Sequence, residues 1–150
     1  MVPVMKYRHW FVLIVAVFPW NAQAADWPPV VDQMVARAKK TIHLASLSEF
    51  KKIVDHPGDA LIIDVREADE YETGHVPDAI NIPRGVLEFR IWKLVGFPDK
   101  VDYGRRIYLY CKLSGRTALA AQSLGKLGFT KVTAVDMQID DWTKAGYPLQ

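Results

Sequence analysis

The chemistry of this sequence centres on Cys111, its only cysteine. Cys111 directly follows the apolar run Ile107–Tyr110 and begins the segment Cys-Lys-Leu-Ser-Gly-Arg-Thr of residues 111–117. A helical pattern comes next, so the cysteine is predicted to lie in a tight loop between a strand and a helix. Such a loop turns its backbone N–H groups inward and forms an anion-binding nest at the helix N-terminus. The segment therefore predicts a nucleophilic thiol beside an anion site.

Several features of this segment favour the thiolate of Cys111, which is the reactive form of a cysteine. The dipole of the following helix and the two cationic side chains of the segment stabilise negative charge, and its glycine gives the backbone freedom. We expect Cys111 to be the nucleophile and the rest of the segment to bind substrate, namely Lys112, Leu113, Ser114, Gly115, Arg116 and Thr117. The alternative for a lone thiol is a buried, inert cysteine, which the surrounding residues disfavour.

A second polar group follows another apolar run, Ala60–Val65. In open α/β sheets the chemistry lies at the carboxyl ends of the strands, which is where Asp64 and Cys111 are both predicted to lie. Asp64 is expected to support the cysteine loop. Arg66 is expected either to bind an anionic substrate or to tie the end of its strand to Glu70.

These motifs resemble the rhodanese family. Cysteine, four residues, arginine and then serine or threonine is similar to its active-site loop, and the six residues from Cys111 to Arg116 have the length typical of its sulfurtransferases. Asp64-Val65-Arg66 with residues 74–83 (GHVPDAINIP) resembles the family's upstream signature, and residues 142–148 (WTKAGYP) resemble its closing segment. The resemblance covers about residues 41–150.

The resemblance implies a sulfurtransferase that takes sulfane sulfur from thiosulfate or a similar donor and carries it as a persulfide on Cys111. It also implies that Arg116 orders the loop through Asp64, and that His75 lies on a structural turn rather than acting as a base. Two departures stand out. Met137-Gln138 replaces a frequent Gly-Gly before the last helix, and Asp78 replaces a usual glycine.

The order of apolar and polar patterns predicts the fold class. Strands are expected at residues 41–44, 60–65, 79–82, 107–110 and 132–135, and helices at 46–55, 68–72, 85–94, 117–127 and 139–145. Strands separated by helices imply parallel pairing with right-handed crossovers. We therefore expect an α/β rhodanese-like domain over residues 41–150, with a central, mostly parallel five-stranded sheet and helices on both faces. Residues 25–40 form a helical lead, which Pro28 and Pro29 open.

Residues 1–24 are predicted to be a secretory signal peptide. Lys6, Arg8 and His9 form a basic start, Trp10–Phe18 is an apolar run, and Ala22-Gln23-Ala24 is a small-residue cleavage site. The run is about half the ~20 residues that a membrane span needs, which disfavours the alternative of an uncleaved anchor. We expect export through a bacterial inner membrane, a periplasmic protein, and no stable membrane anchor after cleavage.

Composition narrows the partners. Without Lys6 and Arg8 the chain has 17 basic and 17 acidic residues, so no electrostatic footprint for nucleic acid remains. No metal-ligand spacing or nucleotide fingerprint is present, and no cofactor is expected. The expected partners are a small anionic sulfur donor and a thiol, cyanide or protein acceptor.

Two other functions stay open. One is a non-catalytic rhodanese-fold module that binds sulfur or a protein, which the Met137-Gln138 departure supports. The other is a phosphatase or arsenate reductase, which the short loop opposes.

Overall fold

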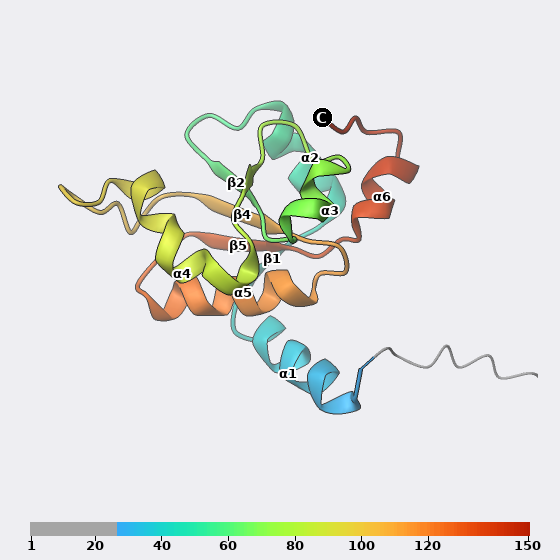
Figure 1. Cartoon of the computed structure of the whole chain (residues 1–150), viewed down its shortest axis with the longest axis horizontal. Helices are drawn as coiled ribbons and strands as arrows, with labels where there is room; N and C mark the ends of the chain where they lie inside the picture. Colours follow the sequence, from blue (N-terminus) through green and yellow to red (C-terminus); the bar gives the residue numbers. More distant parts are fainter. Residues whose placement is uncertain (1–26) are drawn as a thin grey trace, which may run out of the picture.

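The structure is a computed structural model, and it describes residues 27–150. The predicted signal peptide lies outside these residues. Five short strands form one sheet in the order β1-β5-β4-β2-β3 (Figure 1). The strands are β1 (His43–Ala45), β2 (Leu61–Asp64), β3 (Ile80–Asn81), β4 (Ile107–Tyr110) and β5 (Val132–Val135). Every neighbouring pair is parallel, so the sheet is wholly rather than mostly parallel and the predicted α/β class is confirmed.

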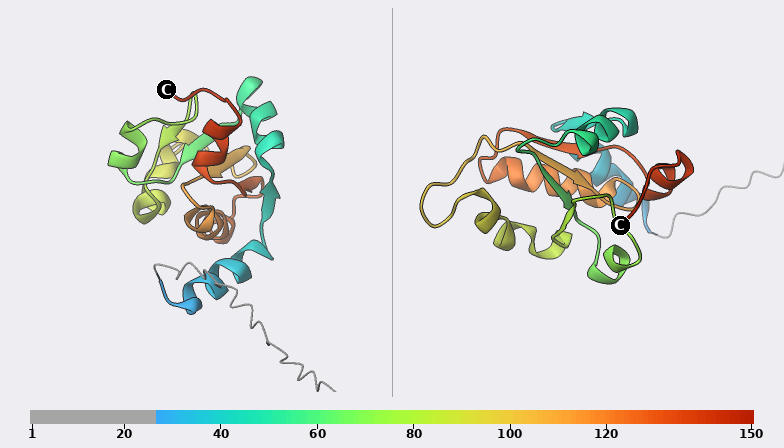
Figure 2. Two further views of the ribbon diagram at one scale, coloured as in Figure 1. Left: turned by 90° about the vertical axis from the view of Figure 1, so that its right-hand side faces the viewer. Right: turned by 90° about the horizontal axis from the view of Figure 1, so that it is seen from above.

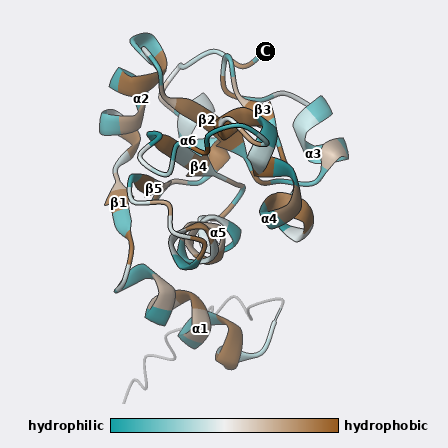
Figure 3. Cartoon of the chain, turned by 90° about the vertical axis from the view of Figure 1, so that its left-hand side faces the viewer, coloured by the Kyte–Doolittle hydropathy of each residue, from teal (hydrophilic) through white to brown (hydrophobic). Residues whose placement is uncertain are grey.

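Helices cover both faces of the sheet (Figure 2). The α-helices are α1 (Pro29–Lys39), α2 (Leu47–Asp55), α3 (Ala68–Glu72), α4 (Leu87–Arg90), α5 (Gly115–Lys126) and α6 (Ile139–Lys144). Two 3₁₀ turns, η1 (Arg84–Val86) and η2 (Ile91–Val95), flank α4. Helix α1 packs against α5 on the side away from the sheet and so forms an outer layer (Figure 3). Within residues 27–150, no helix combines the length and the apolar character that a bilayer crossing requires.

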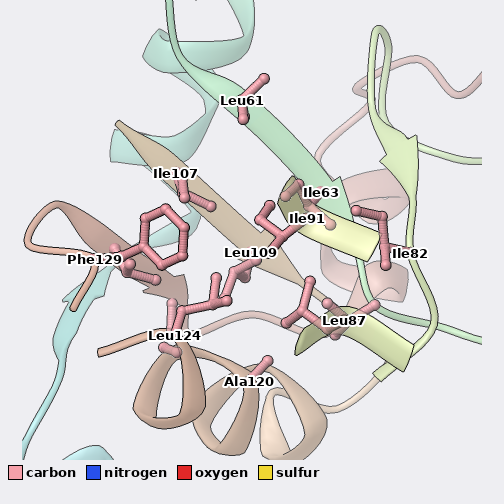
Figure 4. Packing of buried hydrophobic residues seen from close by; sticks show 14 of the residues in the cluster. Leu61, Ile63, Ile82, Leu87, Ile91, Ile107, Leu109, Ala120, Leu124 and Phe129 are labelled. Carbon is pink, nitrogen blue, oxygen red and sulfur yellow. The ribbon is translucent and has the colours of Figure 1, made fainter. Parts of the chain in front are cut away.

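The sheet separates two apolar clusters. One lies between the sheet and the helices α4 and α5, and it includes Cys111. Figure 4 shows Ile63, Leu109 and Leu124 in this cluster. The other lies under α2 and α6, where Phe50 and Trp142 pack with their ring centroids 5.6 Å apart. All four residues of β2 are buried, as expected for a strand covered on both faces. This double burial fixes the carboxyl ends of β2 and β4, from which the polar residues project.

Several predicted boundaries are corrected by the structure. The continuous helix expected over residues 85–94 is instead one α-helical turn between two 3₁₀ turns, because Val86, at the N-cap of α4, has the non-helical angles φ −128° and ψ 7°. The last turn ends at Gly96, whose φ is +98°. Helix α5 begins at Gly115, two residues before the predicted start. The predicted capping box of Ser46 and Glu49 is confirmed at the start of α2.

Candidate active site

Cys111 follows β4 directly and lies between the carboxyl end of that strand and the first turn of α5. Its side chain is 1 % exposed, and it lines a pocket of about 490 Å³. Lys112, Leu113, Ser114, Gly115 and Arg116 also line this pocket. In the described part of the chain, the backbone N–H groups of residues 112–117 have no protein acceptor. Those of residues 115–117 are donors that the start of α5 leaves unpaired, and those of residues 112–114 belong to the loop before it. Together they suit a bound anion.

The loop is held in place from several sides. The Ile139 N–H donates to the Lys112 carbonyl at 3.1 Å, and the Ala118 N–H donates to the Ser114 carbonyl at 3.0 Å. Ser114 has φ +62°, in the left-handed region that costs a side-chain-bearing residue roughly 1–2 kcal/mol. Its hydroxyl accepts a hydrogen bond from Lys39 Nζ at 3.0 Å. These contacts fix a conformation that the loop backbone alone would not favour.

Arg116 pairs with Glu70, and this corrects the expectation that it acts through Asp64. Arg116 Nη1 donates to Glu70 Oε2 at 2.5 Å, and Nη2 donates to Oε1 at 2.9 Å. The hydrogen bond from Arg116 lowers the pKa of Glu70 to about 2 and raises the pKa of Arg116. The pair joins α3 to the first turn of α5, so Glu70 supports the loop from outside the 111–117 segment.

Asp64 and Arg66 form a separate, buried ion pair. Arg66 Nη2 donates to Asp64 Oδ2 at 2.7 Å and to the Gly74 carbonyl at 2.7 Å, and the two side chains are 5 % and 0 % exposed. The structure therefore does not bring Arg66 to the pocket, and the expected tie to Glu70 was wrong. The pair lies beside Tyr110, whose pKa is raised by burial. The Tyr110 hydroxyl accepts from the Val76 N–H at 3.0 Å. The network braces the turn after β2.

The remaining predicted residues lie away from the pocket. Thr117 is fully buried, and its hydroxyl has no hydrogen-bond partner among the described residues. His75 lies in the segment between α3 and the turn at residues 76–79, where its ring stacks on Tyr71 at 3.7 Å between ring centroids. Met137 is buried in the cluster under α2 and α6. The Gln138 N–H donates to the Asp141 carboxylate at the start of α6 and is therefore not free to bind a ligand in the pocket.

Asp78 explains one departure from the family pattern. Its φ is +60°, which glycine adopts freely and aspartate tolerates better than most residues. The Asp78 N–H donates to the Gln150 side chain at 3.0 Å, which helps to hold this turn. The substitution is therefore local to the turn.

The charges around the pocket are mostly paired. Lys39 binds Asp136 at 2.6 Å, and the hydrogen bond from Lys39 lowers the pKa of Asp136. Arg116 is neutralised by Glu70. Among the described residues, Lys112 makes no ion pair, and it is exposed at the pocket. Attraction for an anion therefore comes from the backbone N–H groups and from Lys112 rather than from Arg116.

Sequence reasoning missed the residues that α1 and α5 contribute to the pocket. They are Trp27, Val31, Asp32, Val35, Lys39 and Leu119. Val31, Val35 and Lys39 recur at every fourth position, which indicates one shared helix face but not the part of the domain that this face meets. Within residues 27–150, no group of three or more His, Cys, Asp or Glu side chains is placed to hold a metal ion.

Comparisons with known proteins agree with this geometry. Residues 46–145 match the model of the Rhodanese-like domain. The chain is 37 % identical over 98 residues to the protein YrkF of Bacillus subtilis, a match that covers 65 % of the chain. The chain spans only 49 % of the length of that relative. It is 27 % identical to the thiosulfate:glutathione sulfurtransferase of Saccharomyces cerevisiae, over 85 % of the chain and 95 % of that protein.

Solved structures show the same fold. The solution structure of the polysulfide-sulfur transferase homodimer from Wolinella succinogenes aligns with a TM-score of 0.66 at 27 % identity. That alignment covers 81 % of this chain and 87 % of the other.

Proposed function

The chain belongs to the rhodanese-like domain family, and from that premise we propose that it is a thiosulfate sulfurtransferase that carries sulfur as a persulfide on Cys111. One observation carries the proposal. A single cysteine lies at the end of β4, inside a pocket, where the unpaired N–H groups of residues 112–117 suit a bound anion. A nucleophile next to such a nest has what displacement on an anionic sulfur donor requires.

The proposed reaction has two displacements. The Cys111 thiolate attacks the outer sulfur of thiosulfate and forms a new S–S bond, while the old S–S bond breaks and its electron pair leaves with sulfite. The persulfide anion then rests against the backbone N–H groups of the loop, which stabilise its charge. An acceptor such as cyanide bonds to the outer sulfur, the Cys111–sulfur bond breaks, and the electron pair returns to Cys111 as thiolate.

Lys112 and the loop have separate roles in this proposal. Lys112, exposed and without an ion pair among the described residues, attracts the anionic donor. Arg116 and Glu70 hold the first turn of α5 in place, and Asp64 with Arg66 braces the adjoining turn. The thiolate and the N–H groups are the parts that contact the reacting sulfur.

The test is the mass of the intact protein. Incubation with thiosulfate is expected to add one sulfur atom, and cyanide is expected to remove it as thiocyanate. Cys111→Ser and Cys111→Ala should lose both steps while remaining folded by circular dichroism. Two variants are needed because Cys111 is buried, and a buried hydroxyl without a partner costs about 1–3 kcal/mol. Thiocyanate formation by either variant at the wild-type rate would contradict the proposal.

Two alternatives have their own outcomes in the same assay. A protein that takes up no sulfur from thiosulfate, mercaptopyruvate or inorganic polysulfide would be a binding module. A protein that hydrolyses a phosphate ester through Cys111 and takes up no sulfur would be a phosphatase.

We also propose that the protein is exported and acts in the periplasm. The support is the basic start, the apolar run and the Ala22-Gln23-Ala24 site of the first 24 residues. N-terminal sequencing of the periplasmic fraction is expected to begin at or within two residues of Ala25. A periplasmic or membrane-bound form that still begins at Met1 would contradict cleavage.

A further inference from the structure

Helix α1 forms one wall of the pocket that contains Cys111, although it lies before the residues that match the family model. Four residues spaced by four, Trp27, Val31, Val35 and Lys39, all line the pocket. Trp27 precedes α1, and the spacing places the other three along one side of the helix. The wall therefore presents three apolar side chains, the carboxylate of Asp32 and, where it meets the cysteine loop, the ammonium of Lys39.

This wall is attached at both ends. At its start, Trp27 Nε1 donates to Asp32 Oδ1 at 2.8 Å, which holds the indole against α1. At its end, Lys39 Nζ donates to Ser114 Oγ at 3.0 Å and to Asp136 Oδ1 at 2.6 Å. One lysine thus joins α1 to the cysteine loop and to the residue that follows β5. The wall belongs to the same built site as the loop.

The middle of the wall lies close to the cradle, which consists of the loop of residues 111–117 and its inward-facing N–H groups. A Cβ placed on Gly115 would lie 3.5 Å from Val35 Cγ2, which is ordinary van der Waals contact. Leu119 from α5 and Leu113 from the loop also line the pocket, so aliphatic side chains surround the polar cradle. Figure 3 shows α1 beside α5, with apolar segments on the helix.

The size of the pocket exceeds what an inorganic sulfur anion needs. Its volume of about 490 Å³ falls within the roughly 300–1,000 Å³ of pockets that hold small organic ligands. Thiosulfate is smaller than such ligands and is polar throughout. After the first displacement, the outer sulfur of the persulfide occupies the cradle. The space left for the second substrate is then the part lined by Val31, Val35 and Leu119.

We infer that the acceptor is an organic thiol with an apolar body, aromatic or branched aliphatic, which rests against α1 while its sulfur reaches the persulfide. This inference rests on the proposed function and names its second substrate. The acceptor thiolate bonds to the outer sulfur as the Cys111–sulfur bond breaks, and the electron pair of that bond stays on Cys111. The products are the Cys111 thiolate and an organic persulfide anion, so charge and electrons balance without an added oxidant.

The experiment follows loss of the sulfur atom from persulfidated protein by intact mass, against acceptor concentration. Three acceptors are compared, namely benzyl mercaptan, 2-mercaptoethanol as a polar thiol of similar acidity, and cyanide. Wild-type protein is expected to react with benzyl mercaptan at least about tenfold faster than with 2-mercaptoethanol at equal low concentration, because the apolar body gains burial. Equal second-order rate constants for the two thiols would overturn the inference.

Variants of the wall locate the effect. Val31→Ala and Val35→Ala are each expected to lower the rate constant of sulfur transfer to benzyl mercaptan by about threefold to tenfold. The rate constants for 2-mercaptoethanol and cyanide should stay within about twofold of wild type. Val30→Ala is the matched control, since Val30 is 61 % exposed on the same helix and does not line the pocket. Trp27→Ala should slow the reaction with benzyl mercaptan similarly, and circular dichroism is used to check that this variant, at a position 40 % exposed, remains folded. An equal loss in Val30→Ala, or no loss in the wall variants, contradicts the inference.

The loading step tests the proposed function separately from the acceptor preference. If thiosulfate does not load Cys111, the proposed donor is wrong, and inorganic polysulfide is used to load the protein before the same acceptor comparison. If no donor loads Cys111, both the function and the inference about its acceptor are overturned.

Discussion

Arg116 and Glu70 form a two-pronged ion pair between the first turn of α5 and helix α3, with donor–acceptor distances of 2.5 Å and 2.9 Å. The arginine that closes the cysteine loop is therefore already occupied by a carboxylate. Its two terminal nitrogens aim at Glu70, so in the proposed reaction its part is to position the loop. A guanidinium held this way keeps the N–H groups at the start of α5 in place and does not itself contact the sulfur donor.

Glu70→Gln should lower the unfolding free energy of the protein by an amount that depends on pH. The pKa of Glu70 is lowered by Arg116 to about 2, from an ordinary value of 4.5. A lowered carboxyl pKa contributes stability above the ordinary value and loses it as the pH falls through the folded value. The difference in unfolding free energy between wild type and Glu70→Gln should be about 1 kcal/mol at pH 7, should shrink below pH 4.5, and should vanish near pH 2. Urea titrations at several pH values measure it, and a difference that grows as the pH falls would contradict the pair's role.

Asp64→Asn should be far more damaging than a matched change at the surface. It leaves the Arg66 guanidinium, whose side chain is 5 % exposed, without its counterion, which costs about 3–5 kcal/mol. The control is Asp59→Asn, because Asp59 pairs with Arg106 at 2.6 Å but the two side chains are 64 % and 38 % exposed. That change should cost far less, because an exposed ion pair is screened by solvent and contributes little to stability. Equal losses of unfolding free energy in the two variants would show that burial of the Asp64 pair does not matter.

Lys112→Gln should weaken the donor step and spare the fold. Lys112 is exposed at the pocket, so removing its charge should raise the half-saturating concentration of thiosulfate about threefold to tenfold at low salt, with a smaller effect at high salt. Lys131→Gln, exposed and outside the pocket lining, is the control and should behave as wild type. Steady-state rates at two ionic strengths give the result, and an effect that does not change with salt argues against electrostatic attraction.

The left-handed backbone at Ser114 should be visible in two substitutions at that position. Ser114→Ala removes the hydroxyl that accepts from Lys39 but keeps a side chain at φ +62°. Ser114→Gly removes the hydroxyl and relieves the backbone, so it should be about 1 kcal/mol more stable than Ser114→Ala. Urea unfolding compares the two, and a glycine variant less stable than the alanine variant would contradict left-handed strain at Ser114.

The sequence predicts the parts of the site that are local and misses those that depend on distant packing. The loop from Cys111 to Arg116 and the strand before it follow from contiguous patterns, and the structure contains both. The partner of Arg116 does not follow, because Asp64 and Glu70 are both acidic residues near the end of β2. Asp64 points back to Arg66, two residues away, while Glu70 on α3 reaches Arg116 on α5.

The role of α1 was also beyond the local pattern. Its spacing of apolar residues predicts a helix that packs on the domain, and helix α1 is present at Pro29–Lys39. The same spacing fits any helix with one buried face. That Val31 and Val35 face the cysteine pocket depends on where α1 crosses α5, which no short segment encodes.

The position of β1 has a consequence for where this domain can be cut. The match to the family model begins at residue 46, yet β1 (His43–Ala45) is the edge strand that pairs with β5. A chain trimmed to the matched residues would leave one side of β5 with open N–H and C=O groups, a template on which a strand of another molecule can pair. That new edge would be longer and more apolar than β1, which has three residues, two of them exposed, so such a fragment is expected to self-associate more readily than the whole domain. The seven residues from Lys39 to Ala45 therefore carry both the short, polar strand that covers β5 and the lysine that reaches the cysteine loop.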